Sequence, residues 1–104
     1  MKSIAVSLLL LVAFVGGAVA GQMTITQKGK KFSEKKVELA AGSSIDFVND
    51  DDITHNVYSS SKGHEFDLGA QKPGSTASHV FGASGKVKVR CAIHPKMKMT
   101  IVVN

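Results

Sequence analysis

Hydrophobic and polar residues alternate in short runs along most of this chain, and turn-forming residues separate the runs. The runs lie at residues 23–25, 37–39, 45–47, 57–58, 79–81, 87–91 and 101–103. Alternation with a period of two, at intervals of about 8–12 residues, is typical of the strands of a β-sandwich. No segment after residue 20 shows the apolar periodicity of an amphipathic helix. We therefore expect an all-β fold, a single Greek-key antiparallel β-sandwich of about seven or eight short strands.

The first twenty residues follow a different pattern. Lys2 supplies a positive start, residues 4–15 are almost uninterruptedly apolar, and residues 18–20 form a small-residue cleavage site. This is the pattern of a secretory signal peptide. The apolar run is about a dozen residues, whereas a membrane span needs about 20. We predict a signal peptide over residues 1–20, cleaved near Ala20, and one exported domain over residues 21–104. Retention of the N-terminal segment as an anchor is the alternative.

The charge and the cysteine content of the chain limit its possible functions. The chain has 13 lysine and arginine residues against 8 aspartate and glutamate residues, so a net charge of about +4 remains once Lys2 is removed. Cys91 is the only cysteine, which excludes an internal disulfide. Small exported domains usually depend on disulfides or on a metal. The single thiol is therefore an intermolecular cysteine, a reactive thiol or a metal ligand.

The surroundings of Cys91 favour the metal. Cys91, His94 and Met97 place a thiolate, an imidazole and a thioether in one short segment with Cys-x2-His-x2-Met spacing. With one more imidazole, these donors make a blue-copper electron-transfer site, in which two His and one Cys form a plane and Met is a weak axial ligand. His55, which follows the polar turn at residues 49–52, is the candidate for the second imidazole. The alternation of residues 87, 89 and 91 predicts that Cys91 points into the apolar interior.

On these residues the chain resembles the cupredoxins, the small type 1 copper proteins of the plastocyanin, amicyanin and pseudoazurin group. The resemblance spans the mature chain and rests on residues 55–57, on the segment Cys91-x2-His94-Pro95-x-Met97 and on the closing strand at residues 101–104. The short ligand segment is most similar to that of amicyanin. The resemblance implies one type 1 copper ion bound by His55, Cys91, His94 and Met97. It also implies that Asn56 links the two ligand segments through hydrogen bonds.

Two ligand alternatives remain open. Met99 fits the longer Cys-x2-His-x4-Met spacing of plastocyanin and pseudoazurin, although the distance to the terminal strand favours Met97 and strand parity predicts that Met99 packs in the core. His64 and Glu65 are rival ligands, because some copper proteins of this fold replace the methionine by a carboxylate. His79 is expected to point outward from a strand.

The resemblance implies a periplasmic electron carrier that cycles between Cu(I) and Cu(II). His94 is then the exposed electron port, and the residues around it form the docking surface: an apolar collar and a basic rim comprising Ala92, Ile93, Pro95, Lys96 and Lys98. A basic rim attracts a partner with an acidic surface. The partners implied are a c-type cytochrome or a periplasmic dehydrogenase. A second basic cluster at residues 28–36 is interpreted as a solvated edge.

Other function classes fit less well. No open metal position or nucleophile–base pair indicates an enzyme. Export and the scarcity of stacking aromatics argue against nucleic-acid binding, since Tyr58 is the only aromatic residue with a polar edge. We expect a monomer without stable membrane association. A copper-binding carrier or delivery protein that does not shuttle electrons is the alternative.

Overall fold

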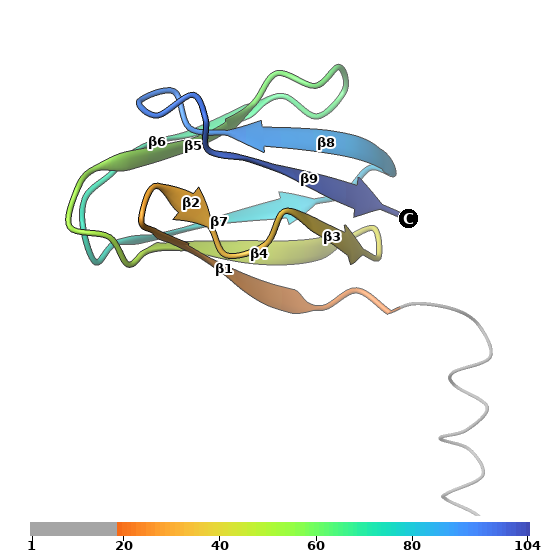
Figure 1. Ribbon diagram of the computed structural model, residues 1–104. Helices are drawn as coiled ribbons and strands as arrows, with labels where there is room; N and C mark the ends of the chain where they lie inside the picture. The colour runs from red at the N-terminus through yellow and green to blue at the C-terminus, as the bar shows by residue number, and fades with distance from the viewer. Residues whose placement is uncertain (1–18) are drawn as a thin grey trace, which may run out of the picture.

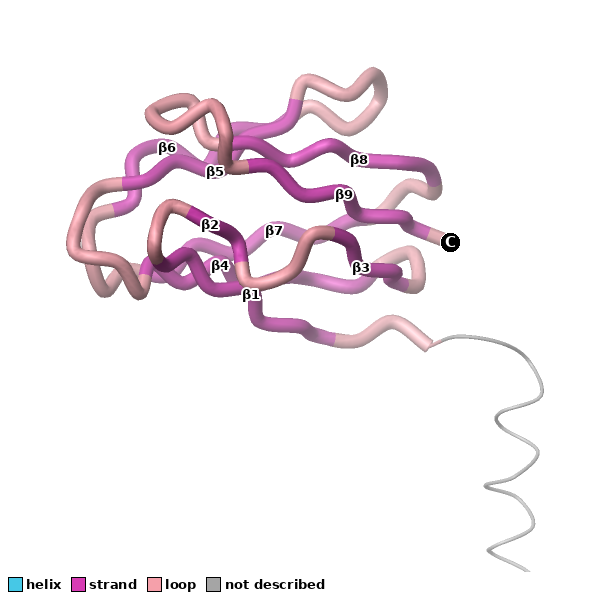
Figure 2. Tube along the Cα trace, in the orientation of Figure 1, coloured by secondary structure: helices cyan, strands magenta, loops and turns pink. Residues whose placement is uncertain are grey.

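Two β-sheets pack face to face in the computed structural model, which describes residues 19–104 (Figure 1). This part of the chain consists of strands and loops, without a helix (Figure 2). The strands are β1 (Gln22–Lys28), β2 (Lys31–Phe32), β3 (Lys36–Leu39), β4 (Ser43–Asn49), β5 (His55–Ser59), β6 (Phe66–Gln71), β7 (Thr76–Phe81), β8 (Gly85–Arg90) and β9 (Lys98–Val103). The predicted all-β sandwich is confirmed.

The first sheet has the strand order β2-β1-β4-β7, and the second has the order β3-β9-β8-β5-β6. Most neighbours are antiparallel, but β1 pairs parallel with β4, and β3 pairs parallel with β9. The predicted signal peptide at residues 1–20 lies almost wholly outside the described residues. Within the described residues, no helix has the length and apolar character required to cross a membrane.

Alternate residues of the strands form the core between the sheets. Ile45 and Phe47 of β4 and Val87 and Val89 of β8 belong to this core, and all four side chains are fully buried. Burying one such side chain stabilises the fold by about 1.5–3 kcal/mol. Cys91 continues the alternation just beyond β8 and is 1% exposed. The prediction that Cys91 points inward is therefore confirmed.

His79 differs from its sequence prediction. It shares the inner parity of β7 with the buried Phe81, and its ring stacks on Phe66 with centroids 3.9 Å apart. Partial burial lowers the pKa of His79 below its ordinary value of 6.5, because burial disfavours the charged imidazolium. The outward orientation expected from the sequence is wrong, because the stack on Phe66 draws the ring inward.

Several loops gather at one end of the sandwich, away from the C-terminus (Figure 1). They are the ligand loop between β8 and β9 at residues 91–97, the β4–β5 loop at residues 50–54 and the β1–β2 turn. Gly29 and Lys30 form this turn with φ angles of 62° and 59°. Two central residues with positive φ make the type I′ turn that fits the twist of a two-residue hairpin. This end holds the candidate ligands.

Candidate metal centre

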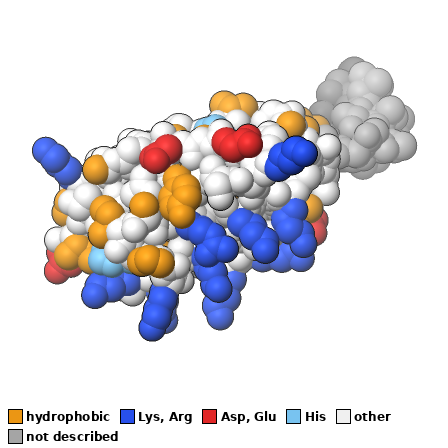
Figure 3. Space-filling model, turned by 90° about the horizontal axis from the view of Figure 1, so that it is seen from above, with side chains coloured by type: hydrophobic (Ala, Val, Ile, Leu, Met, Phe, Trp, Pro, Cys, Tyr) orange, Lys and Arg blue, Asp and Glu red, His pale blue; other side chains and the backbone are white. Residues whose placement is uncertain are grey.

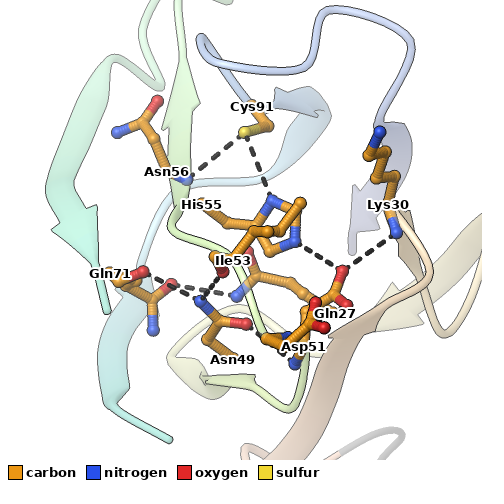
Figure 4. Close-up of polar contacts among 10 residues, drawn as sticks. Gln27, Lys30, Asn49, Asp51, Ile53, His55, Asn56, Gln71 and Cys91 are labelled. Carbon is orange, nitrogen blue, oxygen red and sulfur yellow. Dashed lines mark hydrogen bonds and ion pairs between the residues drawn. The ribbon is translucent and has the colours of Figure 1, made fainter. Parts of the chain in front are cut away.

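His55 and Cys91 face each other in the interior at the loop end of the sandwich. His55 begins β5 and is fully buried, while Cys91 begins the ligand loop after β8. The pairing of β5 with β8 through Tyr58 and Arg90 sets the two segments side by side. His55 Nδ1 lies 3.9 Å from Cys91 Sγ (Figure 4). This distance is shorter than about 4.3 Å, the sum of typical zinc–nitrogen and zinc–sulfur bonds, so one ion of that size can contact both atoms.

The other nitrogen of His55 is held by a carboxylate. His55 Nε2 lies 2.8 Å from Asp51 Oδ2. A carboxylate only accepts hydrogen bonds, so Nε2 carries a proton and Nδ1 is the ring nitrogen that remains to bind a metal beside Cys91. The hydrogen bond from His55 and that from the Lys30 backbone N–H hold the pKa of Asp51 well below its usual range. Asp51 therefore stays ionised and fixes both the tautomer and the orientation of His55.

A buried amide network shapes the loop that carries Asp51. Asn49 is fully buried, and its Nδ2 donates to the carbonyl oxygens of Ile53 and Gln71 at 2.9 and 2.8 Å. Asn49 Oδ1 accepts from the Asp51 N–H at 2.9 Å. Asn49 therefore satisfies backbone groups that the irregular loop would otherwise leave unpaired in the interior. These contacts set Asp51 beneath His55 (Figure 4).

Asn56 connects the two ligand segments. Its backbone N–H donates to Cys91 Sγ at 3.3 Å, and its Oδ1 accepts from the Ala92 N–H at 3.1 Å. Its Nδ2 donates to Asp67 Oδ1 at 2.9 Å and to the Gly69 carbonyl at 3.1 Å, on the neighbouring strand β6. The bond from the Asn56 N–H fixes the Cys91 sulfur beside the beginning of β5. The side chain of Asn56 thus holds the ligand loop to the sheet.

The ligand loop brings His94 close to His55. Its ring centroid lies 5.0 Å from that of His55, and His94 is half-buried. The Met97 N–H donates to the His94 carbonyl at 2.9 Å, and the Cys91 N–H donates to the Met97 carbonyl at 3.3 Å. These bonds close the loop on itself and bring the backbone of Met97 next to that of Cys91.

Both candidate axial methionines are buried, at 2% exposure each. Met97 belongs to the closed ligand loop, whereas Met99 lies in β9, where it pairs in register with Val89. Met99 has the same parity as Ile101 and is part of the hydrophobic core, as its strand position predicted. Met97 is part of the same core cluster at its loop end.

The rival ligand His64 lies elsewhere. A Cβ atom at Gly85 would come within 2.7 Å of His64 Nε2, so His64 lies beside the beginning of β8. Cys91 follows the end of this six-residue strand, which spans about 20 Å. His64 and the adjacent Glu65 are therefore remote from Cys91.

The candidate donors are not yet arranged as a complete metal site. Among residues 19–104, no three His, Cys, Asp or Glu side chains converge closely enough to hold a metal ion by themselves. The second imidazole of a His2Cys set, His94, lies beside His55 with ring centroids 5.0 Å apart. The fourth donor, Met97, is a thioether. The chemistry of these four donors fits copper, which accepts soft sulfur and imidazole together.

Asp51 and Asn49 were not assigned site roles from the sequence. The only signal was the run of three aspartates at residues 50–52, which does not reveal which carboxylate faces His55. The choice depends on the loop conformation that Asn49 fixes and on the Lys30 N–H, which comes from a different hairpin.

Comparison with known proteins identifies the family. Residues 19–104 match the family described as copper binding proteins, plastocyanin/azurin family. The methylamine utilization protein MauL of Methylorubrum extorquens is 31% identical over 90 residues, which span 86% of this chain and 79% of that protein. Amicyanin-alpha of the same organism is 33% identical over 89 residues, which span 83% of this chain and 75% of that protein.

Solved structures share the fold. A purple cupredoxin from Nitrosopumilus maritimus has a TM-score of 0.70 at 24% identity, covering 79% of this chain and 99% of its own. A Cu(I) form of an amicyanin variant has a TM-score of 0.74 at 19% identity, covering 80% of this chain and 82% of its own. The sequence resemblance to cupredoxins is confirmed: the chain belongs to the copper-binding proteins of the plastocyanin/azurin family, and its cofactor is copper.

Proposed function

We propose that this protein is an electron carrier that cycles one type 1 copper ion between Cu(I) and Cu(II), with His55, Cys91, His94 and Met97 as ligands. The observation that carries the proposal is the pair formed by His55 Nδ1 and the buried Cys91 Sγ, 3.9 Å apart. Copper supplies the one-electron redox step, because thiolate and thioether favour Cu(I) while imidazole tolerates Cu(II). The family membership and the amicyanin-like relatives support the same role.

The protein fixes the positions of the proposed ligand side chains. Asp51 orients His55, and the Asn56 N–H fixes the Cys91 sulfur. Both ligand segments are fixed to a rigid sandwich, so a change of oxidation state requires little movement of the protein. Rapid electron transfer depends on such small reorganisation. An electron carrier needs only to hold its metal in both oxidation states, whereas an enzyme must also bind a substrate at the metal. The proposed role is therefore that of a carrier and not of an enzyme.

The proposed electron port is His94, which is half-buried in the ligand loop. Around it, Ala92 and Pro95 are exposed and Ile93 is 48% exposed, so an apolar collar surrounds the imidazole. Such a collar suits brief docking, because it buries a small apolar area without strong polar contacts. The flanking Lys96 and Lys98 are exposed and would attract an acidic partner.

The partners and the location are part of the same proposal. The name of the relative MauL refers to methylamine utilization, which suggests an amine-oxidising periplasmic dehydrogenase as electron donor. A c-type cytochrome is the proposed acceptor. We propose that residues 1–20 direct export and are removed near Ala20, and that residues 21–104 act as a monomeric periplasmic domain without stable membrane association.

Repeated redox cycling separates an electron carrier from a copper-delivery protein. Copper-loaded protein is reduced and reoxidised several times in the presence of a Cu(I) chelator, and both the potential and the copper content are recorded. A carrier keeps its copper and returns to the same potential. Loss of copper to the chelator on the first reduction would contradict the proposal and favour copper delivery.

A further inference from the structure

A groove of about 560 Å³ opens beside the ligand loop and is lined by basic side chains from three parts of the chain. We call it the basic groove. The seven cations come from the β1–β2 hairpin and the loop after it, from β8, and from the ligand loop with the beginning of β9: Lys30, Lys31, Lys35, Lys88, Arg90, Lys96 and Lys98. In the space-filling view, basic side chains gather along one edge of the visible face, beside a group of hydrophobic side chains (Figure 3).

The structure joins two clusters that are separate in the sequence. Lys30, Lys31 and Lys35 belong to the N-terminal cluster that was interpreted as a solvated edge. Lys96 and Lys98 belong to the rim of the ligand loop. The Thr100 N–H donates to the Lys35 carbonyl at 2.9 Å, which ties the loop before β3 to the strand that follows the ligand loop. The two clusters therefore form one basic surface.

The positive charge of the basic groove is not neutralised by the protein itself. No aspartate or glutamate lines it, and within residues 19–104 no lysine or arginine side chain forms an ion pair with a carboxylate. Arg90 and Lys98 lie directly opposite each other on β8 and β9. Like charges in directly opposed cross-strand positions destabilise a sheet. An anionic occupant would relieve this repulsion.

The basic groove leads to the proposed electron port. An adjoining hollow is lined by Ile93 and Pro95 of the apolar collar and by His94. The hollow and the basic groove share Lys30, Lys31, Lys96 and Met97. A molecule in the basic groove therefore lies against residues that also contact the surroundings of His94.

The floor of the basic groove indicates the class of occupant. Phe32, Met97 and Met99 contribute to its lining but are buried, at 8%, 2% and 2% exposure. No aromatic face is therefore free to stack on a base, which single-stranded nucleic acids require. A lipid surface is flat, whereas the groove is concave. A concave surface lined by seven cations and no carboxylate fits a peptide segment that carries carboxylates.

We propose that the basic groove is the docking site for an extended acidic segment of a partner redox protein, which guides that protein to the apolar collar around His94. The inference rests on the proposed electron-carrier function and extends it: recognition is assigned to residues 30–35, 88 and 90 as well as to the ligand loop. Electrostatic attraction of this kind acts mainly on the rate of association.

The test uses a labelled poly-glutamate peptide and copper-loaded protein, with association measured by stopped-flow fluorescence. The groove variant is the double charge reversal Lys31→Glu with Lys98→Glu. The matched control is Lys62→Glu with Lys72→Glu, which changes the net charge equally at exposed lysines outside the groove. We expect the groove variant to lower the association rate about tenfold or more and the control less than about twofold.

Two results would overturn the proposal. Equal loss of rate in both variants would show that net charge alone attracts the peptide. Binding of anionic phospholipid vesicles with the same dependence on Lys31 and Lys98 would make a lipid surface the occupant.

The absorption spectrum and redox reversibility of each sample are recorded in parallel. Reversible copper without selective peptide binding would reject only the groove, whereas irreversible copper in the wild-type protein would reject the electron-carrier function.

Discussion

Replacing Asn56 by alanine tests whether its side chain holds the ligand loop to the sandwich. The substitution removes three side-chain hydrogen bonds, to the Ala92 N–H, to Asp67 Oδ1 and to the Gly69 carbonyl, at 3.1, 2.9 and 3.1 Å. Each contributes about 0.5–1.5 kcal/mol net. Ala92, Asp67 and Gly69 are exposed, so water replaces part of the loss and the total falls toward the lower end. We expect Asn56→Ala to lower the free energy of unfolding by about 2 kcal/mol.

Urea denaturation of the copper-free protein measures this value, with the midpoint expected to fall at an unchanged slope. The backbone N–H of Asn56 still donates to Cys91 Sγ in the variant, so the copper-loaded form should keep its colour. Its copper affinity should fall about 10–100-fold, the usual effect of losing a group that orients a ligand.

Gln22→Ala is the matched control, because the Gln22 side chain is exposed and donates only to the adjacent Met23 carbonyl. This substitution should change stability by less than about 0.5 kcal/mol. If Asn56→Ala also costs less than about 0.5 kcal/mol, the side chain does not hold the loop and the reasoning from its hydrogen bonds is refuted.

Three further predictions test the site and the fold. Met99→Leu should cost less than about 1.5 kcal/mol of stability and leave the copper absorption spectrum unchanged, whereas Met97→Leu should alter it; the reverse pattern would make Met99 the axial ligand. Asp51→Asn should lower copper affinity about 10–100-fold in a chelator competition, whereas Asp52→Asn should not, and equal effects would reject the role of the His55 bond. Because burial lowers the pKa of His79, the unfolded chain binds more protons and stability should decrease as the pH falls below 6.5. In the copper-loaded protein His79→Gln should remove that part of the pH dependence, and identical slopes in urea titrations would contradict it.

The fold was largely predictable because alternation reports burial directly. Val87, Val89 and Cys91 were expected on the inner side of their strand, and all three are buried. Strand β6 was not predicted, because Gly69 interrupts its alternation, at a φ of 78°, and its pairing with β5 has a register shift. Parallel pairing of β1 with β4 and of β3 with β9 was also not predicted, since hydrophobic alternation does not report strand direction.

The candidate site, like the fold, was predictable from the sequence only in part. The donor chemistry of Cys91, His94 and Met97 was visible because the three residues lie in one short segment. The contact between Asp51 and His55 was not, because it depends on a loop conformation fixed by Asn49 and by a backbone N–H of another hairpin. The basic groove depends on tertiary packing between segments more than fifty residues apart, which local patterns do not report.

The proposed function depends above all on Cys91 binding copper as a thiolate within a type 1 site. The most direct measurement is a titration of the copper-free protein with Cu(II), followed by visible absorption, in the wild type and in Cys91→Ser. A type 1 site should give an intense orange-red absorption band and a blue solution, saturating at one copper per chain, with no such band in Cys91→Ser. A Cys91→Ser protein that keeps the band, or a wild-type protein that binds copper without it, would show that Cys91 is not the thiolate ligand of a type 1 site.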